Sequence, residues 1–144
     1  MKRISLLLLS VVFAALLFQS CEDDQTDLTD PRDAIAKSWR VKDSGNPDMD
    51  YDVVITKDPT DITKIWLEGF HNYGSTKIYA TLAGSVITIP QQDASTGEYS
   101  VNGEGTIISA EKLTFEYSLD EGDGYVDYTA EFGKQVTGKK KVLQ

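Results

Sequence analysis

The chain has 144 residues, with 23 aspartates and glutamates against 14 lysines and arginines, and a formal net charge of −9 at pH 7. This acidic balance argues against nucleic acid as a partner, because binding phosphates requires basic side chains. The single cysteine excludes an internal disulfide, so a folded domain has to depend on a hydrophobic core, backbone ladders and short turns.

The first segment, residues 1–20, has the layout of a secretory signal peptide. Lys2 and Arg3 precede an apolar run over residues 4–18, which is shorter than the about 20 residues that a spanning helix needs. Ser20 and Cys21 end the segment, and we predict cleavage between them. Cleavage removes two basic residues and no acid, so the mature chain is more acidic than the precursor.

Cys21 and its flanks resemble the end of a bacterial lipobox, where the cysteine becomes the acylated N-terminus. The acids of residues 22–24 resemble the surface-export signal of Bacteroidetes lipoproteins. The resemblance implies a protein held in the outer membrane by a lipid anchor on Cys21 and exposed at the cell surface. The alternative is a secreted protein that is cut near Ser20 and keeps one unpaired thiol.

An acidic tether is predicted over residues 21–30, because EDDQTDLTD carries five acids and one large apolar residue. Asp30 and Pro31 then indicate a helix start, since aspartate caps helices and proline fits the first helical position. We expect a short helix or turn that continues to Lys37.

The pattern after Ser38 changes to the alternation of β-strands, and turn residues separate the runs. The connections are too short for crossover helices, so the sequence predicts an all-β fold, an eight-stranded antiparallel meander barrel over residues 31–133. A basic tail, residues 134–144, follows. We expect Gly69 to form a bulge in the third strand, and Gly103 and Gly105 to interrupt the sixth. The predicted strands are residues 39–42, 51–56, 63–70, 77–82, 86–89, 98–109, 113–119 and 125–132.

Several short motifs carry a family resemblance. They are Asp30-Pro31-Arg32-Asp33, Trp39, the ITIPQ run at residues 87–91, and the GEGT run at residues 103–106. Together they resemble small Bacteroidetes lipoproteins with a lipocalin-like, or calycin-like, domain. The resemblance implies an eight-stranded barrel, which either fills its interior with side chains or holds one small ligand.

The residues that carry chemistry do not form a catalytic constellation, so we predict that the protein is not an enzyme. His71 is the only histidine, which leaves no triad and no His-rich zinc site, and we expect it in a surface loop beside Tyr73. The acidic run at residues 120–124 is predicted to be a hairpin turn, with a weak calcium site as the alternative, because it lacks the EF-hand spacing. We predict no metal and no cofactor.

The strand aromatics are the candidates for ligand contacts: Trp39, Tyr79, Tyr117 and Tyr128. Each lies on a predicted strand, where its ring would line the barrel interior or its mouth. The alternative is that these rings serve packing and cross-strand pairing.

Two hypotheses on function follow. The first is a lipid-anchored, non-catalytic module that binds a small apolar or saccharide ligand. The second is a structural or interaction lipoprotein with a filled barrel core and other envelope proteins as partners. The volume of the barrel interior distinguishes them, because a drug-sized ligand needs about 300 Å³ or more.

Overall fold

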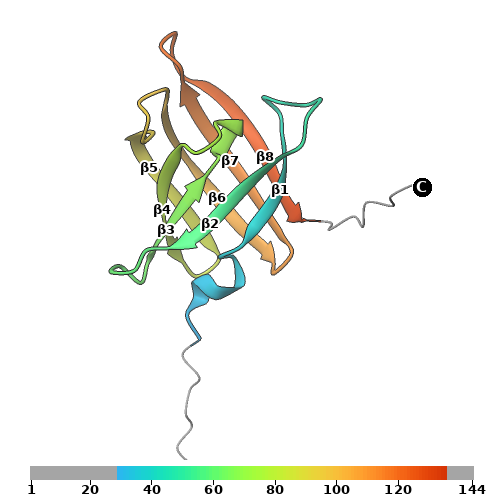
Figure 1. Cartoon of the computed structure of the whole chain (residues 1–144), viewed down its shortest axis with the longest axis vertical. Coiled ribbons are helices and arrows are strands. Elements are labelled where there is room, and N and C mark those ends of the chain that lie inside the picture. The colour runs from blue at the N-terminus through green and yellow to red at the C-terminus, as the bar shows by residue number, and fades with distance from the viewer. Residues whose placement is uncertain (1–28, 136–144) are drawn as a thin grey trace, which may run out of the picture.

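The computed structural model describes residues 29–135, which form one closed antiparallel barrel whose strands follow chain order (Figure 1). The predicted signal segment with Ser20, Cys21, most of the predicted tether and residues 136–144 lie outside the described residues. The strands are β1 (Ser38–Asp43), β2 (Tyr51–Lys57), β3 (Lys64–Glu68), β4 (Lys77–Ala83), β5 (Val86–Asp93), β6 (Ser100–Ser109), β7 (Lys112–Asp120) and β8 (Val126–Lys134).

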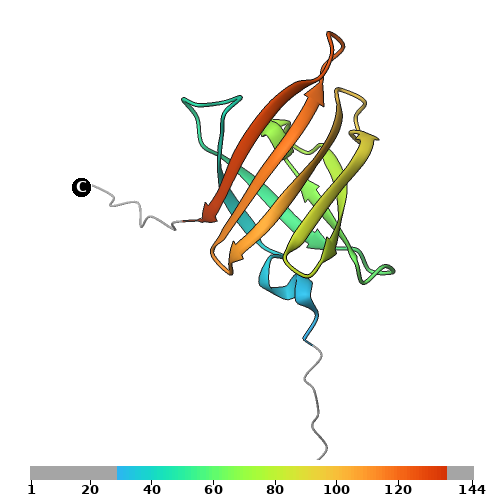
Figure 2. The same ribbon diagram turned by 180° about the vertical axis from the view of Figure 1, so that it is seen from behind.

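The predicted eight-stranded meander is confirmed, and the barrel closes between its first and last strands. β1 pairs with β8 from Trp39 opposite Lys134 to Asp43 opposite Ala130. Figure 2 shows the wall of β5 to β8 from the other side. Among residues 29–135, no helix has the length and apolar content needed to cross a bilayer.

The barrel interior is occupied by side chains from alternate strand positions. On β7 the inward residues are Leu113, Phe115, Tyr117 and Leu119, as the alternation predicts. The bulkiest fully buried side chains are Trp39, Phe70, Phe115 and Phe132. Their rings are in contact, with centroids 4.7 Å apart for Phe115 and Phe132 and 5.9 Å apart for Phe70 and Phe115. The core is therefore a continuous cluster that runs along the barrel axis.

The glycines of β6 do not interrupt the strand, contrary to the prediction. β6 runs without a break from Ser100 to Ser109. A Cβ atom on Gly105 would lie 2.4 Å from the ring of Phe115, and one on Gly103 would lie 2.5 Å from the Cβ of Tyr117. The two glycines thus leave room on β6 for the aromatic residues of β7.

The lower end of the barrel, as drawn in Figure 1, is covered by the 3₁₀ helix η1 (Pro31–Ala34). Asp30 caps this helix by accepting the N–H of Arg32 at 2.9 Å, so the predicted cap is confirmed. Ile35 is fully buried, and its carbonyl accepts the indole N–H of Trp39 at 2.8 Å. Asp30 therefore belongs to the folded domain, whereas the prediction placed it in the tether.

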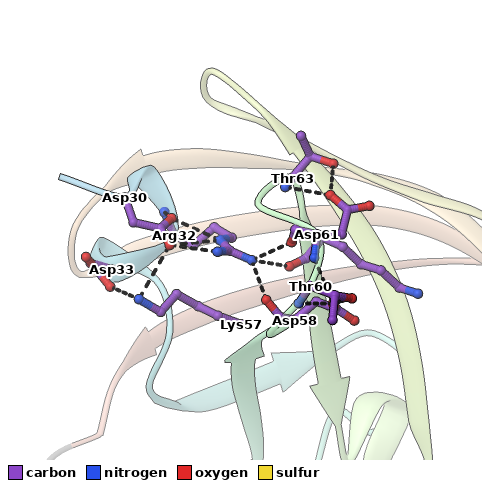
Figure 3. A network of polar contacts seen from close by, with 9 residues as sticks. Asp30, Arg32, Asp33, Lys57, Asp58, Thr60, Asp61 and Thr63 are labelled. Carbon is purple, nitrogen blue, oxygen red and sulfur yellow. Dashed lines mark hydrogen bonds and ion pairs between the residues drawn. The ribbon is translucent and has the colours of Figure 1, made fainter. Parts of the chain in front are cut away.

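Arg32 connects η1 to the loop between β2 and β3 (Figure 3). Its Nη1 donates to the carbonyl oxygens of Asp58, Asp61 and Lys64 at 3.0, 2.7 and 2.9 Å. Its Nε and Nη2 bind the carboxylate of Asp30, with the shortest contact at 2.7 Å. The residue is only 5 % exposed, so one guanidinium joins three segments at this end of the barrel.

The upper end is formed by the loops at residues 44–50, 69–76, 94–99 and 121–125. β3 ends at Glu68, and Gly69 takes a left-handed conformation with φ 82° before the short 3₁₀ segment η2 (Phe70–Asn72). The predicted bulge at Gly69 is therefore wrong, because this residue ends the strand. Phe70 then enters the core, while the residues after it turn to the barrel rim.

Candidate functional site

The candidate site is a groove at the upper end, which we call the rim pocket. It has a volume of about 340 Å³ and draws its walls from the β1–β2 loop, the η2 region, the β7–β8 loop and β8. This volume exceeds the lower limit of about 300 Å³ for typical small-ligand pockets. The rim pocket is lined by Gly45, Asn46, His71, Asn72, Tyr73, Glu121 and Tyr128.

A buried carboxylate lies next to the rim pocket and organises it. The Oδ2 atom of Asp43 accepts the hydroxyl of Tyr51 at 2.6 Å and the hydroxyl of Tyr117. Its Oδ1 atom accepts the N–H of Gly45 at 2.8 Å. The Asp43 side chain is fully buried, so these donors replace the water that the carboxylate has lost.

The protonation of this cluster follows from its contacts. Burial raises the pKa of Asp43, but hydrogen bonds from His71, Tyr117 and Tyr51 outweigh it and hold the pKa at about 2. Burial and the bond to Asp43 raise the pKa values of Tyr51 and Tyr117 well above the usual range of tyrosine. At neutral pH an ionised carboxylate therefore lies between two neutral hydroxyl donors.

His71 lies between this cluster and the rim pocket, which corrects the prediction of a surface position. Its side chain is 8 % exposed, and its Nδ1 atom lies 2.6 Å from the hydroxyl of Tyr117 and 3.2 Å from Asp43 Oδ2. Tyr73 does lie beside it, with the rings stacked at 6.1 Å, and Tyr128 lies closer, at 4.6 Å. The imidazole is thus held on one edge by polar contacts and on its faces by rings.

The backbone at His71 is held in a conformation that few side chains adopt. His71 has φ 55° and the next residue, Asn72, has φ 66°. Left-handed residues other than glycine cost about 1–3 kcal/mol each and persist where their surroundings hold them. The contacts with Asp43 and Tyr117 supply that restraint, so the network fixes the loop as well as the ring.

Gly45 keeps the space between the rings open. A Cβ atom at this position would lie 2.5 Å from Cε1 of His71 and 2.9 Å from Cε1 of Tyr128. Neither distance occurs between real Cβ atoms and their neighbours, so a larger residue would displace one of the rings. The absence of a side chain at Gly45 therefore shapes the rim pocket.

The predicted ligand residues divide between the site and the rest of the barrel. Tyr117 and Tyr128 come together, with their rings stacked at 5.5 Å, and Tyr128 lines the rim pocket. Trp39 is buried at the opposite end, beneath η1. Tyr79 lies on the outer wall against Trp66, with ring centroids 6.0 Å apart. The aromatic pattern thus identified one side of the site and missed Asp43 and His71.

The acidic run at residues 120–124 forms the predicted turn between β7 and β8. The Oδ1 atom of Asp120 accepts the N–H groups of Gly122 and Gly124 at 2.7 and 2.9 Å. Within residues 29–135, no three His, Cys, Asp or Glu side chains are grouped as metal ligands would be. The Asp120 carboxylate therefore serves as a turn-forming acceptor.

A second groove, of about 410 Å³, lies on the outer wall over β6, β7 and β8, which are the orange and red strands of Figure 2. Asn102, Glu116, Ser118 and Asp127 are among its lining residues. This groove lies on one sheet face, whereas the rim pocket combines groups from three loops and a buried histidine. The rim pocket is the stronger candidate for that reason.

Comparisons with known proteins identify the fold. No protein-family model matches the chain, and no curated protein matches it either. Among solved structures the chain is similar to a redesigned β-barrel, with 17% sequence identity and a TM-score of 0.51. The match covers 75% of this chain and 97% of that one. At this identity the likeness establishes an eight-stranded barrel architecture for the chain.

Proposed function

We propose that the protein is a non-catalytic binding module of the cell envelope, which holds a saccharide in the rim pocket. The supporting observation is the composition of that pocket, where the rings of Tyr73 and Tyr128 stand beside polar groups of Asn46, Asn72 and Glu121. Sugars present both apolar ring faces and hydroxyl groups. The exposed lining of the rim pocket is mostly polar, which suits the hydroxyl groups, and the tyrosine rings border it.

Of the two ligand classes expected from the sequence, the structure favours the saccharide over an apolar molecule. An apolar ligand requires apolar walls, but the barrel interior is occupied by side chains such as Trp39, Phe70 and Phe115, and the exposed lining of the rim pocket is mostly polar. The same observation supports the alternative proposal, a structural lipoprotein that contacts other envelope proteins and holds no ligand. The two proposals differ at the rim, where only the first requires a bound sugar.

The binding proposal is tested by calorimetric titration of the full chain with oligosaccharides and with a fatty acid. We expect heat from an oligosaccharide and none from the fatty acid. Tyr128→Ala should weaken saccharide binding roughly tenfold, because truncating an aromatic contact at the centre of a site typically removes more than 1 kcal/mol. Tyr79→Ala, the same change on the outer wall, is the matched control and should leave the affinity unchanged.

Tryptophan fluorescence is unsuited to this test. Trp39 lies under η1, and the indole of Trp66 donates to Asp58 in the β2–β3 loop at 2.9 Å, so both belong to the lower half of the barrel. Heat evolved by a fatty acid and no response to sugars would contradict the rim site. If neither the oligosaccharides nor the fatty acid evolve heat, the structural lipoprotein without a ligand is the proposal that stands.

We also propose that a lipid on Cys21 anchors the protein in the outer membrane. The chain enters the barrel at η1, and the rim pocket lies at the opposite end, so an anchor before η1 would leave the pocket facing away from the membrane (Figure 1). This arrangement suits a surface module that meets its ligand outside the envelope.

The anchor is tested by replacing Cys21 with serine in a bacterium that processes lipoproteins. We expect the variant to leave the membrane fraction and to lose fatty-acid labelling, because serine cannot form the thioether to diacylglycerol. Ser20→Ala serves as the control, since it keeps a small residue at the cleavage position. Equal membrane retention and labelling of Cys21→Ser and the parent would contradict the anchor.

A further inference from the structure

The upper end of the barrel has acidic loops, flanked by Lys42 on β1 and Lys77 on β4. Its four loops, residues 44–50, 69–76, 94–99 and 121–125, contain no lysine or arginine. Their acidic residues are Asp48, Asp50, Glu98, Glu121 and Asp123. A potential of one sign over a rim attracts ligands of the opposite charge and repels acidic ones. Charge alone selects no ligand, so the specificity of the site depends on the groups inside the pocket.

The first of these groups is the imidazole of His71, whose hydrogen positions follow from its neighbours. The hydroxyl of Tyr117 donates to Asp43, so its oxygen faces Nδ1 of His71 as an acceptor. Nδ1 therefore carries the proton in the neutral ring, and the lone pair is left on Nε2. Asp43 thus sets the tautomer that His71 presents.

The Nε2 atom of His71 has no hydrogen-bond partner among residues 29–135. Every buried side-chain nitrogen or oxygen in that range does have one, so Nε2 reaches solvent. His71 lines the rim pocket, so a ligand there can meet this atom. In the neutral ring, Nε2 is the one acceptor of this largely buried side chain that no residue of the range uses.

One further group in the pocket suits a cation. The carboxylate of Glu121 accepts the hydroxyl of Tyr73, which places a negative charge at the edge of the pocket. This charge is independent of the acceptor on His71.

We propose that the rim pocket recognises a charged primary amine, so that its saccharide ligand is an amino sugar with a free amino group. This inference rests on the proposed function, because it names the class of the saccharide. An ammonium group donates to Nε2 of His71 and is attracted by Glu121. A neutral sugar satisfies only the acceptor, and an acidic sugar is repelled.

The test uses three ligands that share one sugar ring and differ in charge. Methyl 6-amino-6-deoxyglucoside, methyl glucoside and methyl glucuronide are titrated into the full chain at neutral pH, with binding followed by NMR. We expect the amine to bind at least about tenfold more tightly than the neutral glucoside, and the glucuronide more weakly than either. The advantage of the amine should shrink as salt is added.

Matched variants locate the charge effect. Glu121→Gln should reduce the affinity for the amine about fivefold and the affinity for the neutral glucoside by clearly less, because the amide keeps a hydrogen-bonding group and loses only the charge. Glu104→Gln makes the same change in net charge at an exposed position on β6, and should alter neither affinity. Equal effects of the two variants would assign the preference to overall charge and overturn the role of the pocket.

The single histidine of the chain gives a direct readout on the unmodified protein. Nitrogen-15 NMR of a chain purified without a histidine tag reports one imidazole, which we expect to carry its proton on Nδ1. Its Nε2 signal should shift when the amine binds. Equal affinities for the amine and the neutral glucoside would overturn this inference and leave the saccharide proposal intact. If none of the three ligands shifts a rim signal, both fail.

Discussion

Replacement of Asp43 by asparagine is expected to lower the free energy of unfolding by about 3–5 kcal/mol, because several buried donors lose the ionised acceptor that they share. The carboxylate accepts from Tyr51, Tyr117 and the N–H of Gly45, and an asparagine amide turns one acceptor oxygen into a donor that faces donors. Chemical denaturation of the parent and the variant measures the difference. Asp123→Asn, the same change at an exposed turn position, should stay within about 0.5 kcal/mol of the parent.

The contribution of Asp43 should also depend on pH in a defined direction. Its pKa in the folded protein is about 2, below the ordinary aspartate pKa of 3.8. A carboxyl with a depressed pKa stabilises the fold above its unfolded pKa and loses that contribution as the pH falls through the folded value. The stability gap between the parent and Asp43→Asn should therefore be constant near neutral pH and narrow between pH 4 and 2. A gap that stays below about 1 kcal/mol at neutral pH would contradict the assigned role of the network.

Arg32→Lys is expected to lower the free energy of unfolding by about 2–3 kcal/mol, although it keeps the charge. The guanidinium bonds three carbonyl oxygens of the β2–β3 region and both carboxylate oxygens of Asp30 at once. A lysine ammonium has three donors at one point and cannot reach both sides. The buried carbonyls of that loop then lose their partner.

The matched control for this change is Arg40→Lys. Arg40 binds Asp52 at 3.1 Å, but its side chain is 44% exposed, so the loss should be below about 1 kcal/mol. Thermal melts of both variants and the parent give the comparison. If Arg32→Lys and Arg40→Lys have the same melting temperature, the lower end is held by burial of Ile35 and Trp39 and not by the guanidinium.

The fold was predictable because its signals are local. Alternation over residues 113–119 places four side chains on one face, and that face is buried in the barrel. The Asp30-Pro31 pair indicated a capped helix start, which η1 confirms. Both patterns depend on neighbours in the sequence, which is the range over which propensity and periodicity carry information.

The site was less predictable, because its parts are distant in the chain. His71 contacts groups that lie 28 and 46 residues away, at Asp43 and Tyr117, and only the closed barrel brings them together. A lone histidine in a polar loop carries no local signal of burial. Gly105 gave a misleading signal, because a glycine within a strand usually indicates an interruption. Here the register places Gly105 opposite Phe115, and the glycine makes room for that ring.

The pairing of β1 with β8 has a consequence for how the molecule acquires its structure. The residues that close the barrel, such as Trp39 and Lys134, stand at opposite ends of the described chain. A chain that lacks β8 leaves the outer edges of β1 and β7 without partners, and such edges template association between molecules. Ring closure is also a long-range step, and long-range pairings slow folding because loop entropy is lost before the contacts form. The native state is therefore reached only after synthesis of the final strand, and the growing chain is most vulnerable just before that point.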